Sequence, residues 1–332
     1  MQPPLTNRAV DFSAGRLFVV TDLHGEWDPY QRYRDYFLEL YHHDEADVFL
    51  LLGDLIHGRG DPDEDYSLAM VLDVMQLQQE LGHSNVVMLL GNHELPHIYH
   101  ILLAKGRELY TPRFEYALGD YRTDVLAFFD SLPFVARTAG GLLFTHAGPH
   151  PGTATEDVAA KLLNFSHDEL KAVANELIAN YDIMTLVSQY LGWSEREYQL
   201  QAQAQLAVPG PDDERYLDLL QGVVVSHLDP EWSILWDFFF TRCEEVVSPP
   251  NQYAGLVRRF LRAYSASDWA ANVLVTGHIN VDGGYKVLNR SHLRMASYSH
   301  ARPPDEGHFL FVEADRPIQD ARELTEMAYR IP

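Results

Sequence analysis

Cysteine is nearly absent from this chain, because Cys243 is the single thiol among 332 residues. One thiol cannot build an internal disulfide framework, and such sparse use of cysteine fits a reducing compartment. The N-terminal stretch MQPPLTNRAV lacks a basic segment followed by an apolar one, so we expect no secretory signal. The longest apolar runs are strand-sized and far shorter than the roughly 20 residues that span a bilayer. The sequence therefore predicts a soluble cytoplasmic protein without a membrane partner.

Basic residues are also scarce. The chain has 25 Lys and Arg against 48 Asp and Glu, which gives a formal net charge of −23. A surface of this sign repels a phosphate backbone, so nucleic acid is not an expected partner, although the composition leaves room for a local positive pocket. No internal repeat is evident. With 46% hydrophobic residues the chain can bury a substantial core. Nothing in the composition predicts an oligomeric state.

Apolar runs in the first half of the chain predict three buried strands, at Leu17–Val20, Val48–Leu52 and Asn85–Leu90. Amphipathic patterns between these runs predict helices, and the alternation is typical of an α/β fold. Further strand-like runs lie at 142–144, 222–228, 272–275, 285–288, 293–297 and 308–313.

Residues 151–222 have a different character, because helix signals dominate there and carry no recognisable chemistry. Ser194 and Glu197, for example, have the spacing of a helix capping box. We interpret 151–222 as a helical insertion or cap within a single domain that spans 1–332. It is expected to lie beside the site and to shape substrate access. A regulatory or dimerisation role is the alternative.

Metal-ligating side chains follow the predicted strands, and glycines accompany them. Gly53 and Asp54 come directly after one strand, and Gly91 and Asn92 directly after the next. In open α/β sheets ligands bind at the carboxyl ends of the strands. A plain turn is the alternative for any single pair, but repetition at successive strand ends argues against it. We therefore expect six ligands to converge: Asp22, His24, Asp54, Asn92, His146 and His278.

This ligand set is rich in oxygen and imidazole and contains no thiolate, which suits Mn, Fe or Zn. Six ligands crowd one ion but fit two if Asp54 bridges them. Two ions a few Å apart hold a nucleophilic oxygen and a phosphoryl oxygen for in-line displacement, so a bridging hydroxide is expected to attack phosphorus directly. His93, next to Asn92, is placed to protonate the leaving oxygen as general acid. Arg59 is expected to hold the non-bridging phosphate oxygens.

The order of these motifs resembles that of the calcineurin-like metallophosphoesterases, and most closely their phosphoprotein phosphatase branch. The single His278 before Gly283 is typical of that branch, whereas many phosphodiesterases have a second histidine where this chain has Asn280. The segment Ile234–Asp237 is similar to a Leu-Leu-Trp segment of the branch. The motifs are Asp22-x-His24-Gly25, Gly53-Asp54, Gly91-Asn92-His93-Glu94, His146-Ala147-Gly148 and Gly277-His278.

The resemblance implies a sandwich of two mixed β-sheets flanked by helices, with a binuclear metal centre at the sheet edges. It implies that one metal takes Asp22, His24 and Asp54. It implies that the other takes Asp54, Asn92, His146 and His278, with manganese, iron or zinc as the ions. His93 would be the general acid and Arg59 a phosphate clamp.

The chain departs from the branch in the segment His57-Gly58-Arg59. The branch has Gly-Asp-x-x-Asp-Arg-Gly there, and its second Asp orients the catalytic histidine, whereas this chain has one extra residue and no second Asp. A further phosphate-binding arginine is expected before the last histidine. Arg242 is the candidate, ahead of Arg258 and Arg259, which lie in a predicted helix.

Three functions remain open at this stage. The first is a bimetal phosphomonoesterase similar to Ser/Thr protein phosphatases, with a phosphoprotein or a small phosphoester as substrate. The second is a hydrolase of dinucleoside polyphosphates, of the diadenosine tetraphosphate type, or of related nucleotides. The third is a binding module without catalysis, which is disfavoured because every expected ligand and His93 are present.

Overall fold

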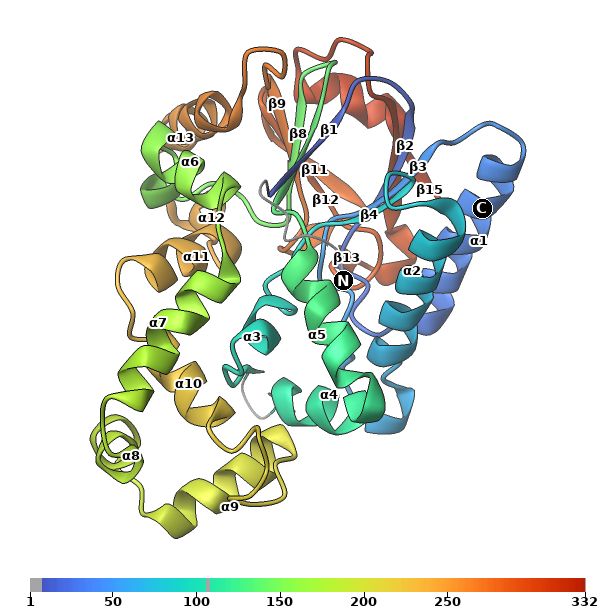
Figure 1. Ribbon diagram of the computed structural model, residues 1–332. Coiled ribbons are helices and arrows are strands. Elements are labelled where there is room, and N and C mark those ends of the chain that lie inside the picture. The colour runs from blue at the N-terminus through green and yellow to red at the C-terminus, as the bar shows by residue number, and fades with distance from the viewer. Residues whose placement is uncertain (1–7, 106–107, 332) are drawn as a thin grey trace. The chain divides into compact units, whose positions relative to one another are not determined.

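The computed structural model describes residues 8–105 and 108–331. Residues 1–7, on which much of the expectation about a secretory signal rests, lie outside the described part. The chain divides into two compact units, which are labelled by element in Figure 1. The first unit combines the segments up to Asn92, from Ser131 to Phe165 and from Ile234 onward. The second consists of His93–Asp130 and Ser166–Ser233.

A five-stranded mixed sheet in the first unit has the strand order β15-β14-β2-β3-β4. Strands β2, β3 and β4 run parallel, while β14 pairs antiparallel with both β2 and β15. The carboxyl ends of the three parallel strands therefore share one edge of the sheet. The bounds are β2 (Arg16–Val20), β3 (Val48–Leu51), β4 (Val86–Met88), β14 (His308–Glu313) and β15 (Ala328–Arg330).

A six-stranded mixed sheet has the order β1-β7-β8-β9-β12-β11. Strand β9 pairs in parallel with both β8 and β12, so the loops after these three strands begin at the same edge. The bounds are β1 (Ala9–Phe12), β7 (Val135–Thr138), β8 (Leu142–Thr145), β9 (Val273–Thr276), β11 (Tyr285–Asn289) and β12 (His292–Met295). Two short strands, β10 (Val281–Asp282) and β13 (Ala301–Arg302), pair separately.

The two sheets share one apolar core. Leu50 of β3, Phe144 of β8 and Val275 of β9 are completely buried in the same cluster. Alternate residues of a buried strand point to opposite faces, so every second apolar residue faces this core. The prediction of two mixed sheets packed as a sandwich and flanked by helices is confirmed.

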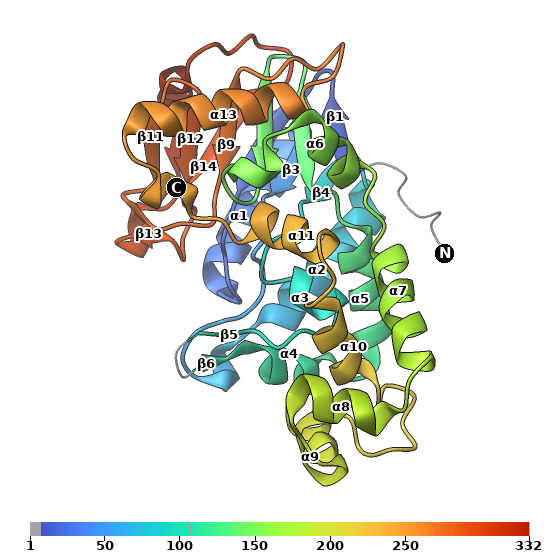
Figure 2. The same cartoon turned by 90° about the vertical axis from the view of Figure 1, so that its left-hand side faces the viewer.

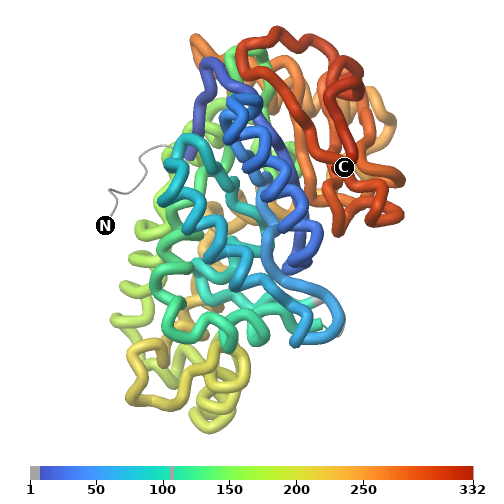
Figure 3. The backbone as a smooth tube through the Cα atoms, turned by 90° about the vertical axis from the view of Figure 1, so that its right-hand side faces the viewer, coloured from blue at the N-terminus to red at the C-terminus, as the bar shows by residue number. Residues whose placement is uncertain are grey.

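Helices cover the outer faces of the sandwich. Helices α1 (Trp27–His42) and α2 (Ser67–Leu81) lie side by side on the five-stranded sheet (Figures 1 and 3). Helix α13 (Pro250–Tyr264) contacts β9 and packs on α6 (Glu156–Leu163) over the other sheet (Figure 2). Both sheets therefore have two buried faces, which explains their continuous apolar runs.

Phe18 anchors α1 to its sheet, and its loss is expected to destabilise the first unit. The fully buried ring stacks on Phe309 of the sheet at 4.2 Å, and its centroid lies 6.1 Å from that of Phe37 in α1. Phe18→Ala leaves a cavity between α1 and the sheet, so we expect a loss of about 3–5 kcal/mol in the free energy of unfolding. Denaturant unfolding measures it. Val246→Ala, a surface truncation at 74% exposure, should change it by less than about 0.5 kcal/mol.

The second unit is mainly helical. Its helices include α3 (Leu95–Ile98), α4 (Tyr110–Leu118), α7 (His167–Ala179), α8 (Ile183–Leu191), α9 (Glu195–Leu206) and α10 (Asp218–Val225), and α5 (Arg122–Ser131) ends at its border. A chain of ion pairs with a buried end at His97 and Glu115 joins its two segments. Glu115 lies 3.1 Å from His97 and 2.9 Å from Arg122, which also pairs with Asp218 at 3.0 Å. Burial raises the pKa of Glu115, but His97 and Arg122 outweigh it and lower that pKa to about 2.

One sequence expectation is wrong here. The run 222–228, predicted as a strand, lies largely in helix α10. The Val-rich composition favours a strand, but Leu219, Leu220 and Val224 are buried in the helical unit, and that packing decides the conformation. Gly222 allows the close approach, because a Cβ there would lie 2.5 Å from the carbonyl oxygen of His100.

The expectation of a single domain with a helical insertion at 151–222 stays a prediction. The compact helical unit has other bounds, since it also includes His93–Asp130. The C-terminal segment contains a short 3-10 helix, Ala321–Met327, and strand β15, which lies at the edge of the five-stranded sheet. Within the described ranges, none of the helices has the length and apolar character needed to cross a bilayer.

Candidate metal centre

The loops that carry the predicted ligands have unusual backbone conformations. Asp22, His24, Asp54 and His278 have φ values of 51°, 45°, 54° and 70°. The left-handed region costs non-glycine residues on the order of 1–3 kcal/mol each, and such strain concentrates at functional sites. Four of the six predicted ligands therefore occupy strained positions at strand ends. Packing of the apolar core does not by itself require these positive φ values.

Asp22 ties the loop after β2 to the loop after β9. The backbone N–H of His278 donates to Asp22 Oδ1 and Oδ2, at 3.1 and 3.0 Å, and the Thr21 hydroxyl donates to Oδ2 at 2.5 Å. Gly277 has no room for a side chain, because a Cβ would meet Thr21 and Asp22. Segments from both sheets are thus fastened to one buried carboxylate.

Asp54 lies between two histidines. Its Oδ2 is 3.4 Å from His146 Nε2 and 3.7 Å from His24 Nε2, and all three side chains are buried. The carbonyl oxygen of Ile56 lies 3.0 Å from His24 Nδ1, so this nitrogen carries the proton and leaves the lone pair of Nε2 on the side of Asp54. A backbone carbonyl that fixes the tautomer is typical of metal-binding histidine.

Both ring nitrogens of His146 face oxygen atoms. Its Nδ1 faces Leu52 O at 2.8 Å, while its Nε2 faces Asn92 Oδ1 at 2.8 Å and Asp54 Oδ2 at 3.4 Å. A neutral imidazole has one N–H, so the second nitrogen needs a proton or a metal ion among these oxygens. Burial lowers the pKa of His146, but Asp54 outweighs it and raises that pKa to about 9. The residues fit a metal ion, which would take the place of the second ring proton between Nε2 and these oxygens.

His278 completes this group. Its Nδ1 lies 2.8 Å from Asn92 Oδ1, and its buried Nε2 has no hydrogen-bond partner in the described part of the chain. Burial lowers the pKa of His278 to about 3 and that of His24 to about 4, so both imidazoles are neutral and can act as ligands. Ligand atoms of Asp54, His146 and His278 all lie within 4.8 Å of one another.

A second group contains a residue that the sequence did not single out. Ligand atoms of Asp22, His24 and His300 also lie within 4.8 Å of one another. Burial raises the pKa of Asp22, but His300 and His146 together outweigh it and leave that pKa well below its usual range. His300 belongs to none of the motifs. Its one signal is its position shortly after the strand at 292–295, since the other candidates also follow strands.

His93 and Arg59 are two of the predicted catalytic residues. His93 follows Asn92 and begins the second unit, where its ring lies 5.3 Å from that of Tyr110. Arg59 is exposed in the loop after β3, and its charge lowers the pKa of Glu26 against the larger effect of burial. Their roles stay predictions.

Arg242 is exposed at the start of α12 (Cys243–Val246) and pairs with Glu245 at 2.7 Å. It lines a hollow of about 260 Å³ together with His150, Trp236 and Phe240. Its contact with phosphate stays a prediction.

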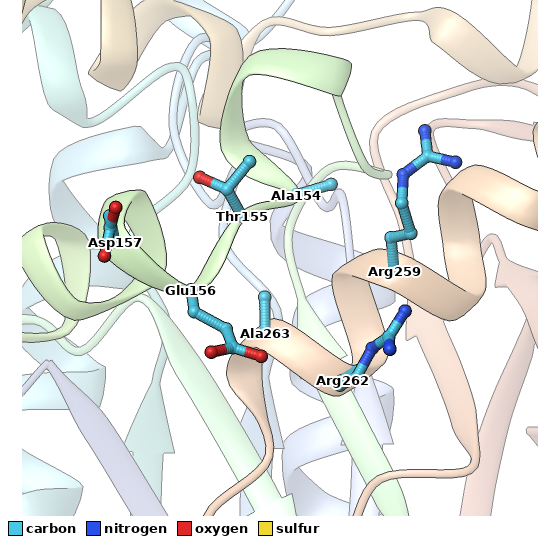
Figure 4. Close-up of a pocket in the computed structure, with 7 residues that line it drawn as sticks. All are labelled: Ala154, Thr155, Glu156, Asp157, Arg259, Arg262 and Ala263. Atoms are coloured by element: carbon cyan, nitrogen blue, oxygen red, sulfur yellow. The ribbon is translucent and has the colours of Figure 1, made fainter.

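Arg259, the less favoured arginine, lines a different hollow of about 310 Å³ between α6 and α13 (Figure 4). Arg262 lines it from the same helix, and Glu156 and Asp157 line it from the other side. No predicted metal ligand lines this hollow. The two negative charges balance the two positive charges, so this hollow has no electrostatic preference for an anion.

Comparison with known proteins identifies a family for this chain. The calcineurin-like phosphoesterase family matches residues 15–203, whereas no curated protein matches the chain. The solved structures to which this chain shows some similarity include a protein serine/threonine phosphatase from Saccharomyces cerevisiae with similarity to human phosphatase PP5. It is 16% identical, with a TM-score of 0.46, and 92% of this chain covers 76% of that one.

A cold-active protein tyrosine phosphatase is 15% identical, with a TM-score of 0.45, and 93% of this chain covers 76% of that one. A metallophosphoesterase from Sphaerobacter thermophilus is 13% identical, with a TM-score of 0.32 and coverages of 91% and 86%. The family match spans more than half of the sequence and includes the first four ligands and His146. The chain therefore belongs to the calcineurin-like phosphoesterase family.

Proposed function

We propose that this protein is a two-metal phosphatase that hydrolyses phosphomonoesters, with Mn, Fe or Zn as its ions. The observation that carries the proposal is the position of Asp54. Its carboxylate lies between His24 and His146, each of which belongs to a separate group of converging ligand atoms. A carboxylate with two oxygens can bridge two ions, and two-ion sites are typical of phosphoryl transfer.

These residues would hold two ions. Asp22, His24 and Asp54 would hold the first ion. Asp54, Asn92, His146 and His278 would hold the second. When bound, the ions supply positive charge that activates water and stabilises the developing charge on phosphoryl oxygens. The hydrogen bonds from His24 and His146 to backbone carbonyls orient the rings before any ion arrives.

Other side chains are proposed to act on the substrate. His93 donates a proton to the leaving oxygen, and Arg59 and Arg242 bind the non-bridging phosphate oxygens. Asn280 supports a monoester over a diester, because many phosphodiesterases of this superfamily have a histidine there. The preferred substrate is a phosphorylated Ser or Thr residue of a protein, as in the phosphoprotein phosphatase branch. The single cysteine supports a cytoplasmic location.

A dinucleoside polyphosphate is the second candidate substrate. Trp236 is 46% exposed and stacks on Phe240 at 4.0 Å and 5° between ring planes. Both rings line the hollow that contains Arg242. An exposed aromatic surface beside a cation suits a nucleobase that carries phosphates.

A substrate panel tests the proposal. Metal content is measured first, and rates are then compared on an aryl phosphomonoester, an aryl phosphodiester, a phosphopeptide and a diadenosine polyphosphate. We expect two ions per chain and turnover on monoesters that a chelator abolishes and added metal restores. Preference for the diadenosine polyphosphate selects the second candidate. Metal binding without turnover on any of the four selects a binding module and overturns the proposal.

A further inference from the structure

The ring of His300 is buried against the first two ligands of the proposed centre. It is 7% exposed, and its Nδ1 lies 2.9 Å from Asp22 Oδ1. Its ring centroid is 5.0 Å from that of His24, at an interplanar angle of 62°. Two ligands at about 2.1 Å from one ion lie about 3.0–3.4 Å apart in octahedral or tetrahedral geometry. The spacing between His300 and Asp22 is close to this range.

Hydrogen bonds hold the segment around His300 in place. The N–H of Ser299 donates to Asp22 O at 3.2 Å, and its hydroxyl donates to Leu23 O at 3.1 Å. The N–H of Val281 donates to His300 O at 2.8 Å. The segment is thus bonded to the loop that carries Asp22 and to the chain that follows His278. The ring position results from this framework and does not depend on its contact with Asp22 alone.

Asn280, the residue at the position of the second histidine of many phosphodiesterases, is engaged elsewhere. It is exposed, and its Oδ1 accepts a hydrogen bond from Arg302 Nη2 at 2.9 Å. The imidazole that accompanies Asp22 and His24 in this chain comes instead from a different segment, beyond β12. The fold therefore places a histidine beside Asp22 and His24 from a position that no motif marks.

We propose that His300 is a ligand of the first metal ion, which would then have Asp22, His24, His300 and the shared Asp54. This inference rests on the proposed two-metal function. With His300, the first ion would have four protein ligands, as many as the second. A second imidazole favours nitrogen-preferring ions such as Zn and Fe over Mg at this position.

Two variants of His300 separate coordination from simple hydrogen bonding. His300→Ala removes the ring, and His300→Gln keeps the size and an N–H that can donate to Asp22 but supplies no imidazole nitrogen. Asn280→Ala is the matched control at the position of the family's second histidine. Circular dichroism verifies the fold of each variant. The apoprotein is then titrated with Co²⁺ in a calorimeter, and paramagnetic proton NMR counts the exchangeable ring N–H signals of coordinated histidines.

We expect the wild type and Asn280→Ala to bind two Co²⁺ with the same set of signals. Both His300 variants should lose more than about 100-fold in affinity at one of the two sites, which is beyond the usual cost of losing an outer partner, and should lose one ring signal. If His300→Gln binds like the wild type, or if both variants keep every signal, His300 only orients Asp22 and the inference is wrong. If the wild type binds no ion, the proposed function fails with it.

Discussion

Asp54→Asn is expected to abolish metal-dependent turnover while the fold survives. The substitution keeps the size of the side chain but removes the charge that would attract both proposed ions. The affected oxygen lies 3.4 Å from His146 Nε2 and 3.7 Å from His24 Nε2, so both halves of the centre lose their common anion. We expect kcat to fall at least about 10³-fold, or ~4 kcal/mol of transition-state stabilisation, with fewer than two ions retained per chain.

The control for this prediction is a carboxylate of the same type outside the centre. Asp63 is exposed in the short helix Pro62–Glu64, and Asp63→Asn makes the same change in net charge. Metal content, measured on both variants after dialysis, should be normal in Asp63→Asn and reduced in Asp54→Asn. A normal rate with two ions in Asp54→Asn would show that Asp54 does not bridge.

Much of the candidate metal centre could be predicted from the sequence because the pattern that indicates it is local. In the segment around Gly53 and Asp54, a fully buried strand, a break and a carboxylate follow one another within a few residues. Parallel pairing then brings such segments to one edge, since β2, β3 and β4 are neighbours in register. A strand pattern therefore predicts not only the element but also where its terminal side chain lies.

His300 was not accessible in this way. Its relation to Asp22 depends on hydrogen bonds between segments far apart in the sequence, such as that from Ser299 N–H to Asp22 O. Helix α10 was misread for a related reason. The conformation of its Val-rich run is set by burial in the helical unit, which a short apolar run does not reveal. The failures therefore lie where tertiary contacts, and not local pattern, decide the outcome.

The loop that departs from the phosphoprotein phosphatase pattern is built around structural hydrogen bonds. His57 is buried with a φ of 72°, and its N–H donates to Ser67 Oγ at 2.8 Å. Asp65 accepts from the N–H of Ser67 at 3.0 Å, and its carboxylate packs against Gly58, where a side chain would not fit. These contacts fasten the segment His57-Gly58 to the start of α2. Because the family's second Asp is absent from this segment, the role of His93 is tested by kinetic measurements.

His93→Ala is expected to lose turnover but keep both ions. No ligand assignment involves His93, whereas its neighbour Asn92 contacts His146 and His278 through one oxygen. Removing a general acid typically costs 10²–10⁴-fold in rate, and the cost grows as the leaving group becomes more basic. We therefore expect kcat to fall by about 10³-fold on an alkyl phosphomonoester and by much less on a nitrophenyl ester, whose leaving group needs little protonation.

The comparison of two substrates distinguishes acid catalysis from a disturbed site. A misplaced centre would slow both esters equally. Loss of the acid slows the alkyl ester more, so the ratio of the nitrophenyl rate to the alkyl rate rises in the variant. His83→Ala is the control, since His83 is an exposed histidine near the end of α2. It should leave the ratio and the metal content unchanged. If His93→Ala hydrolyses the alkyl ester at the wild-type rate, the proton comes from another group, and His93 has no catalytic role in this reaction.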